Sequence, residues 1–177
     1  GSGPVTSAPV TLPPTTSAPN DFLGEEIVGT SAGGRPISAR HRGTAGGAVV
    51  LVVGVIHGTE DAGLAVLDLL DTLPLPQGID LWLMPAMNPD GLAADARHNA
   101  RGVDLNRNFH DFSQPLPHNA GYDELAALLV PPAWPPNDAV KAGIARYVAA
   151  HGMGALQAAV SGGQHAHPEG LFYGGVN

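Results

Sequence analysis

Two residues in the first half of the chain have the types and the spacing of a metal site. His57-Gly-Thr-Glu60 places an imidazole and a carboxylate three positions apart, directly after an apolar run. A turn from a strand into a helix can bring both side chains to one metal ion. The same pair is also typical of a surface histidine beside a glutamate that the helix dipole favours. Because the chain has no cysteine, a metal would be held by His, Asp or Glu.

Two further polar segments follow along the chain. Asn88-Pro-Asp-Gly91 is a turn signal and by itself indicates no chemistry. The run from Arg97 to Phe109, RHNARGVDLNRNF, places three arginines and several amide side chains in one loop of an otherwise acidic protein. Guanidinium groups bind carboxylates through paired hydrogen bonds. This loop therefore predicts a site for a carboxylate ligand.

Hydrophobic patterning predicts the elements that position these segments. Residues 26–30 and 36–41 flank a Gly-rich turn and read as a hairpin. Residues 48–56 and 79–85 are apolar on both faces, as in buried strands, and residues 60–73 show helical spacing between them.

The second half of the sequence continues this alternation. Residues 122–129 predict a short helix, Asn137 can cap a further helix, and residues 156–161 read as a third buried strand. The pattern predicts an α/β fold, with a mainly parallel mixed sheet sandwiched by helices. Ligands in such folds bind beyond the carboxyl ends of the strands, where the polar segments fall.

Composition divides the chain and limits its partners. Residues 1–20 are rich in Thr, Pro and Ser and predict a disordered leader or linker, which favours an exported protein. Residues 21–177 form the expected domain. A net charge of −8 with a single lysine argues against nucleic-acid binding. The sequence has no apolar run long enough for a membrane span.

Taken together and in this order, the three segments resemble the zinc carboxypeptidase family, from about Phe22 to the C-terminus. Arg97 shortly before Gly-Val-Asp-Leu-Asn-Arg-Asn is most similar to bacterial murein peptide amidases. The resemblance implies a carboxypeptidase-like fold, one zinc ion, and hydrolysis of an amide bond next to a free carboxylate. The expected substrates are peptides or peptidoglycan stems.

The resemblance also implies roles for individual residues. His57 and Glu60 would be zinc ligands, and Asp104 would accept the other ring N–H of His57. Arg97 would polarise the scissile carbonyl and stabilise its oxyanion. Asn106 and Arg107 would clamp the substrate carboxylate.

The sequence departs from the family pattern at the third zinc ligand. The family has a histidine at the end of a strand, but residues 156–161 contain none. Gln164, His165 and His167 follow, and each is a candidate. We expect His167, because Pro168 stiffens the backbone that would hold it and an imidazole suits zinc better than an amide.

The general base is the second departure. The family's catalytic glutamate lies on a later strand, and this sequence ends at Asn177 before such a segment. We therefore expect the N-terminal part of a catalytic domain. Two alternatives stay open: an N-acyl amino acid deacylase of the aspartoacylase type, and a non-catalytic module that binds peptides ending in a carboxylate.

Overall fold

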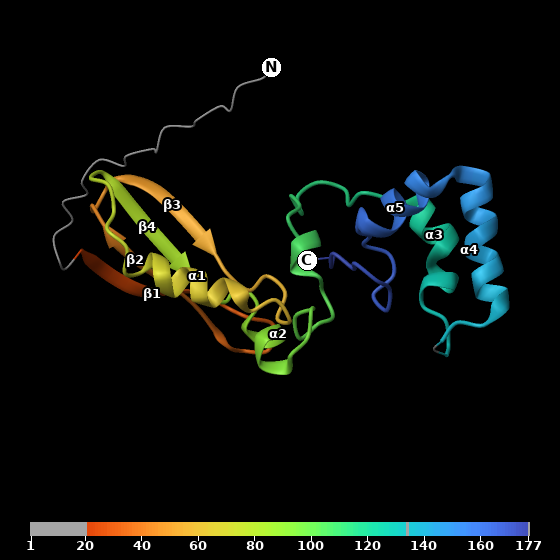
Figure 1. The fold of residues 1–177 in the computed structure, drawn as a ribbon, viewed down its shortest axis with the longest axis horizontal. Helices are drawn as coiled ribbons and strands as arrows, with labels where there is room; N and C mark the ends of the chain where they lie inside the picture. Colours follow the sequence, from red (N-terminus) through yellow and green to blue (C-terminus); the bar gives the residue numbers. More distant parts are fainter. Residues whose placement is uncertain (1–20, 134, 177) are drawn as a thin grey trace, which may run out of the picture.

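The computed structural model describes residues 21–133 and 135–176. The predicted leader, residues 1–20, lies outside the described residues. Figure 1 shows a β-sheet with helices beside it at one end of the molecule and a separate group of helices at the other end. The segment after the last helix runs back between these two parts.

In the described residues, four strands form one mixed sheet in the order β1-β2-β4-β3. The strands are β1 (Phe22–Thr30), β2 (Pro36–Gly43), β3 (Ala48–Val53) and β4 (Ile79–Met84). The hairpin β1–β2 confirms the expectation from the turn between them. Both predicted strands are also present as β3 and β4, which pair in parallel. The prediction that residues 48–56 are buried is wrong for β3, because it lies at the edge of the sheet with Val49, Val50 and Leu51 exposed.

Helix α1 (Ala62–Leu70) connects β3 to β4 and covers one face of the sheet. Its buried residue Leu67 packs against Leu81 and Leu83. Leu81 and Leu83 are two positions apart along β4, so both side chains point to the same face of the sheet. Trp82, between them, stacks on His41 of β2 with ring centroids 4.1 Å apart.

The α/β class with a mixed sheet is confirmed, but the sheet is not mainly parallel. β1–β2 and β2–β4 are antiparallel, and only β3–β4 is parallel in the described part of the chain. A tight turn makes β1–β2 antiparallel, whereas the helical crossover through α1 makes β3–β4 parallel. The sheet is also not sandwiched by helices here, because the other large helices pack mainly on one another.

Three helices make the second part of the fold. They are α3 (Ala120–Leu129), α4 (Asp138–His151) and α5 (Met153–Ser161). Side-chain oxygens of Asn119 and Asn137 accept hydrogen bonds from the first turns of α3 and α4, so the predicted cap at Asn137 is confirmed. Leu125, Tyr147 and Ala159, one from each helix, form the buried centre.

The predicted third strand, residues 156–161, is wrong, because this segment lies in α5. Leu156, Ala159 and Val160 recur at helical spacing and face the cluster around Leu125. The segment is rich in Ala and straight-chain residues, which favour helix over strand. A short apolar run does not distinguish a buried strand from a buried helix face.

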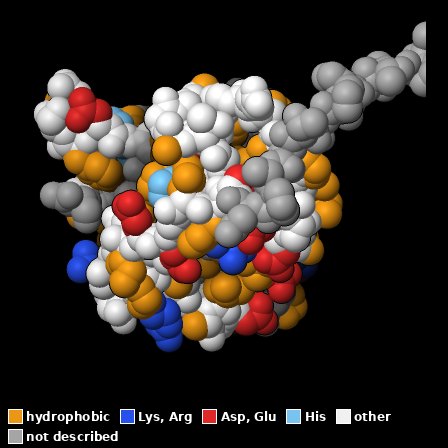
Figure 2. Space-filling view, turned by 90° about the vertical axis from the view of Figure 1, so that its left-hand side faces the viewer, with side chains coloured by type: hydrophobic (Ala, Val, Ile, Leu, Met, Phe, Trp, Pro, Cys, Tyr) orange, Lys and Arg blue, Asp and Glu red, His pale blue; other side chains and the backbone are white. Residues whose placement is uncertain are grey.

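Two short helices carry the polar motifs. They are α2 (Pro89–Ala94) and the 3₁₀ helix η1 (Leu105–Arg107). The segment after α5 returns to η1, where the Asp104 amide donates to the Tyr173 carbonyl at 2.8 Å. Figure 2 views the sheet end, where hydrophobic and acidic side chains lie side by side on the surface. No helix in residues 21–133 and 135–176 is long and apolar enough to cross a membrane.

Candidate functional site

Four polar side chains from three segments form one hydrogen-bonded network. Nε2 of His57 lies 3.0 Å from Oδ1 of Asp104, and its Nδ1 lies 3.0 Å from Oε1 of Glu60. Arg97 closes the network, since its Nε donates to Asp104 at 3.0 Å and its Nη1 to Glu60 at 3.3 Å. The structure thus brings together four of the residues to which the resemblance gives a role.

The electrostatics of the network keep its carboxylates ionised. Asp104 is fully buried, and burial raises its pKa, but the hydrogen bonds from His57 and Arg97 outweigh burial and leave the pKa below its usual value. The hydrogen bond from His57 also lowers the pKa of Glu60, and the charge of Arg97 adds to this effect. Glu60 is largely exposed, so it forms the open side of the network.

The chain reaches His57 through an unusual backbone turn. Val55 has a φ of 44°, a left-handed conformation that is an outlier for a β-branched residue. Asn88 holds this turn. Its backbone amide donates to the Val55 carbonyl at 2.9 Å, and its side-chain Nδ2 donates to the carbonyls of Ile56 and Arg97, both at 3.3 Å. One buried asparagine therefore positions the segments that carry His57 and Arg97.

A close backbone approach fixes the same region. Gly58 lies directly against Gly91 of α2, where a Cβ on Gly58 would come within 1.9 Å of the Gly91 carbonyl carbon. Only glycine fits at this position. The contact packs the His57 turn against α2, which the Asn88 side chain caps by accepting from the Gly91 amide.

Asp90 links this site to the β1–β2 hairpin. Its buried carboxylate accepts from the Ser31 hydroxyl at 2.8 Å, the Gly33 amide at 2.9 Å and Arg35 at 3.1 Å. The Asn-Pro-Asp-Gly turn, which suggested no chemistry in the sequence, is therefore a structural junction. Its positioning role could not be read from the sequence, because the partners of Asp90 are 55 to 59 residues away.

The second arginine of the expected site lies close to the first. Arg107 donates from Nε to the Ser161 carbonyl and from Nη1 to the Asn106 carbonyl, both at 3.0 Å. Its guanidinium carbon lies 5.2 Å from the ring centroid of Phe172, and that of Arg97 lies 5.5 Å from the same centroid. Phe172 was not singled out in the sequence, because nothing local marks it as a neighbour of either arginine.

The candidates for a third ligand lie in the loop after α5. Gln164 is buried, and its side-chain oxygen accepts from the amides of Ala166 and His167 at 2.9 and 2.7 Å. Nε2 of His167 lies 2.7 Å from Asp123, and Nδ1 of His165 faces the Gly175 carbonyl. Within the described ranges no group of three His, Asp or Glu side chains is placed to share a metal ion. The identity of the third ligand stays a prediction.

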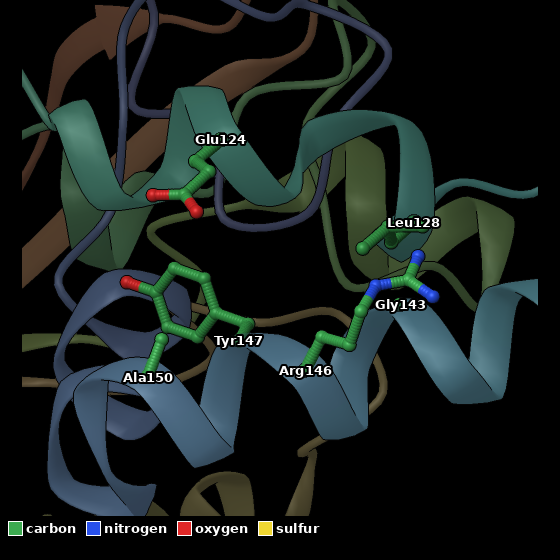
Figure 3. A pocket seen from close by; sticks show the side chains of 6 residues that line it. All are labelled: Glu124, Leu128, Gly143, Arg146, Tyr147 and Ala150. Atoms are coloured by element: carbon green, nitrogen blue, oxygen red, sulfur yellow. The ribbon is translucent and has the colours of Figure 1, made fainter.

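One hollow of the described structure lies away from the network residues. A pocket of about 320 Å³ lies between α3 and α4, where Glu124 and Tyr147 face one another across the gap (Figure 3). Glu124 lies 3.5 Å from His151. None of the residues that line this pocket belongs to the network around His57, so it is not part of the candidate site.

Comparison with known proteins finds a matching family model and a relative that is similar to part of the chain. A family model described as "Protein of unknown function (DUF2817)" matches residues 39–177. Carboxypeptidase SOL1 of Arabidopsis thaliana is 38% identical over 71 residues, which are 33% of this chain and 14% of that protein. The chain thus spans a small part of the length of this relative.

Solved structures give similar matches. Murein-tripeptide amidase MpaA from Escherichia coli O157 is 32% identical, with 49% of this chain and 37% of that chain covered and a TM-score of 0.40. Carboxypeptidase A from Helicoverpa armigera is 28% identical, with 52% and 29% covered and a TM-score of 0.43.

Proposed function

This chain belongs to the family described as "Protein of unknown function (DUF2817)", and we propose that it carries part of the site of a zinc-dependent hydrolase. The reaction is hydrolysis of an amide bond next to a free carboxylate, in a peptide or a peptidoglycan stem. The observation that supports this most is the contact of His57 with Asp104 on one ring nitrogen and with Glu60 on the other.

The spacing of these atoms suits a metal. Two atoms bonded to one zinc ion at about 2 Å lie roughly 3–3.5 Å apart. Nδ1 of His57 and Oε1 of Glu60 are 3.0 Å apart. Asp104 occupies Nε2 and so leaves Nδ1 for the metal, as outer carboxylates do in zinc sites. His57 and Glu60 would therefore hold the ion from one side.

The third ligand is proposed to be His167. The side-chain oxygen of Gln164 already accepts hydrogen bonds from two backbone amides of its own loop. The two histidines of this loop are therefore the remaining candidates. Asp123 binds Nε2 of His167 and leaves Nδ1, an arrangement similar to that of Asp104 on His57. His165 is the alternative, since the Gly175 carbonyl lies at its Nδ1 and leaves its Nε2.

Each residue of the site has a separate task. A bound zinc ion would supply a Lewis acid that polarises the carbonyl and lowers the pKa of a water molecule. Arg97 would donate to the oxyanion that forms on the scissile carbonyl, and Asn106 and Arg107 would bind the substrate carboxylate. The sequence assigns no general base, because Glu124 and Glu169 lie outside the matched motifs.

A substrate panel tests this function. The chain is loaded with zinc and offered a peptide acid, the matching peptide amide and an N-acyl amino acid, each with and without EDTA. EDTA-sensitive binding or cleavage of the peptide acid supports the proposal. Cleavage of the N-acyl amino acid alone would indicate a deacylase of the aspartoacylase type.

The non-catalytic module is the second candidate, favoured by the lack of a three-residue metal group among the described side chains. It predicts that peptide acids bind with equal affinity with and without zinc and are never cleaved. Zinc-dependent binding would exclude it.

A further inference from the structure

Phe172 stands where the proposed substrate would meet its two arginines. The guanidinium carbons of Arg97 and Arg107 lie 5.5 and 5.2 Å from its ring centroid. Both distances are within the range of cation–π attraction. The two guanidinium groups that are proposed to bind the substrate therefore face an aromatic ring of the protein itself.

The backbone of Phe172 is fixed in a strained conformation. Its φ of 53° is left-handed, which is rare for a bulky side chain. Its carbonyl accepts from the Gln164 amide at 3.2 Å, and the carbonyl of Tyr173 accepts from the Asp104 amide at 2.8 Å. These two hydrogen bonds hold the backbone of the loop in place. The Phe172 ring can still move, because rotation of its side chain breaks neither of them. Strain held in place by surrounding bonds is characteristic of functional positions.

An apolar space lies beside the ring. A pocket of about 620 Å³ is lined by Leu129, Ile144, Leu156, Gln157, Val160, Ser161 and Phe172. The carbonyl of Ser161 accepts from Arg107, so the rim of the pocket and the guanidinium are adjacent. Phe172 thus lies between the two arginines and an apolar pocket that can receive an aromatic ring.

We propose that Phe172 is a gate that covers Arg97 and Arg107 until a substrate carboxylate binds, and then turns into this pocket. The inference rests on the proposed function, which gives the two arginines to the substrate. Charge-assisted hydrogen bonds to a carboxylate are stronger than cation–π contacts, so the ligand can displace the ring. The displaced ring would then lie against the apolar side chains that line the pocket.

Removal of the ring should strengthen carboxylate binding. Two exposed cation–π contacts correspond to about a tenfold difference in affinity. We therefore expect Phe172→Ala and Phe172→Leu to bind N-acetyl-leucine about tenfold more tightly than the parent, with no gain for N-acetyl-leucinamide. Phe172→Leu keeps apolar volume at the site, so it serves if Phe172→Ala does not fold. Phe109→Ala is the matched control, since Phe109 is 70% exposed and lies just after Arg107.

Filling the pocket should have the opposite effect on binding to removing the ring. Gln157 is exposed at its lining, so Gln157→Trp should fill the space without disturbing the core. With no place for the ring to turn, N-acetyl-leucine should bind several-fold more weakly. The Nε–Hε signals of Arg97 and Arg107 in ¹⁵N NMR spectra report the ring directly, because an aromatic ring shifts nearby protons. Ligand binding to the parent should move them toward their positions in Phe172→Leu.

The outcomes separate the gate from the function on which it rests. If Arg107→Ala abolishes acid binding but Phe172→Ala and Phe172→Leu bind no more tightly than the parent, the gate is overturned and the carboxylate site stands. If no variant distinguishes the acid from the amide, the carboxylate site is overturned together with the gate. Unchanged or tighter binding by Gln157→Trp would also overturn the gate.

Discussion

Asp104 binds Nε2 of His57 at 3.0 Å and thereby turns the opposite ring nitrogen toward Glu60. The two residues are 47 positions apart in the sequence. Arg97 adds a second hydrogen bond to the same carboxylate, so the buried charge of Asp104 is compensated from two sides. The orientation of His57 therefore depends on the loop that carries Asp104.

Asp104→Asn should weaken zinc binding by about 10–100-fold, the usual loss when the outer partner of a histidine ligand is changed. The asparagine keeps the size of the side chain but not its charge. Zinc affinity is measured by isothermal titration calorimetry. Asp95→Asn is the control, because Asp95 is an exposed helix cap in a left-handed conformation that asparagine also adopts. Equal affinity of the parent and Asp104→Asn would contradict this role.

Acid should remove the stabilising effect of Asp104. Its pKa in the folded protein lies below the usual value, so its contribution is fully present above about pH 4 and is lost as the pH falls through the folded pKa. The difference in unfolding free energy between the parent and Asp104→Asn should shrink between roughly pH 5 and pH 2. Urea unfolding at several pH values measures it, and a difference that grows with acidification would refute the prediction.

Arg107→Ala should discriminate between acids and amides. We expect a loss of about 1.5–3 kcal/mol for a ligand with a free carboxylate, because a charge-assisted hydrogen bond is removed. The amide of the same ligand should lose far less. Arg101→Ala, in the same loop, is the control, since Arg101 has no assigned role. Similar losses for both ligands would remove Arg107 from the carboxylate site.

The choice of the third ligand is tested by two single variants. His167→Ala should lower zinc affinity and stoichiometry, whereas His165→Ala should leave both close to the parent. Tight binding by His167→Ala together with weak binding by His165→Ala would reverse the assignment. If both variants bind like the parent, neither histidine is a ligand.

Gly58→Ala should disturb the site without changing any polar group. A Cβ at this position meets the backbone of Gly91 at 1.9 Å, and neither segment can yield easily. We expect a destabilisation of about 1–3 kcal/mol or more, with weaker zinc binding. Gly154→Ala is the contrast: a Cβ there meets nothing within 4 Å, and alanine in helix α5 should stabilise by about 0.5–1 kcal/mol. Thermal unfolding measures both, and a neutral Gly58→Ala would show that the turn is not tightly packed.

Local patterns in the sequence predicted much of the fold. The hairpin, the positions of strands β3 and β4, and the cap of α4 follow from turn residues, periodicity and the Asn137 side chain, which act over a few positions. Residues 156–161 show where this reasoning fails. Both a buried strand and a helix face present short apolar runs, and the packing of Leu156 and Val160 on the cluster around Leu125 decided for the helix.

The sequence by itself determined which residue types the site contains, because His57, Glu60, Arg97 and Asp104 stand in recognisable motifs. Only the tertiary structure decided what holds them. Asn88 reaches the carbonyls of Ile56 and Arg97, and Phe172 meets two arginines 65 and 75 residues before it. Contacts at such separations leave no local pattern, since they depend on how turns and helices bring distant segments together.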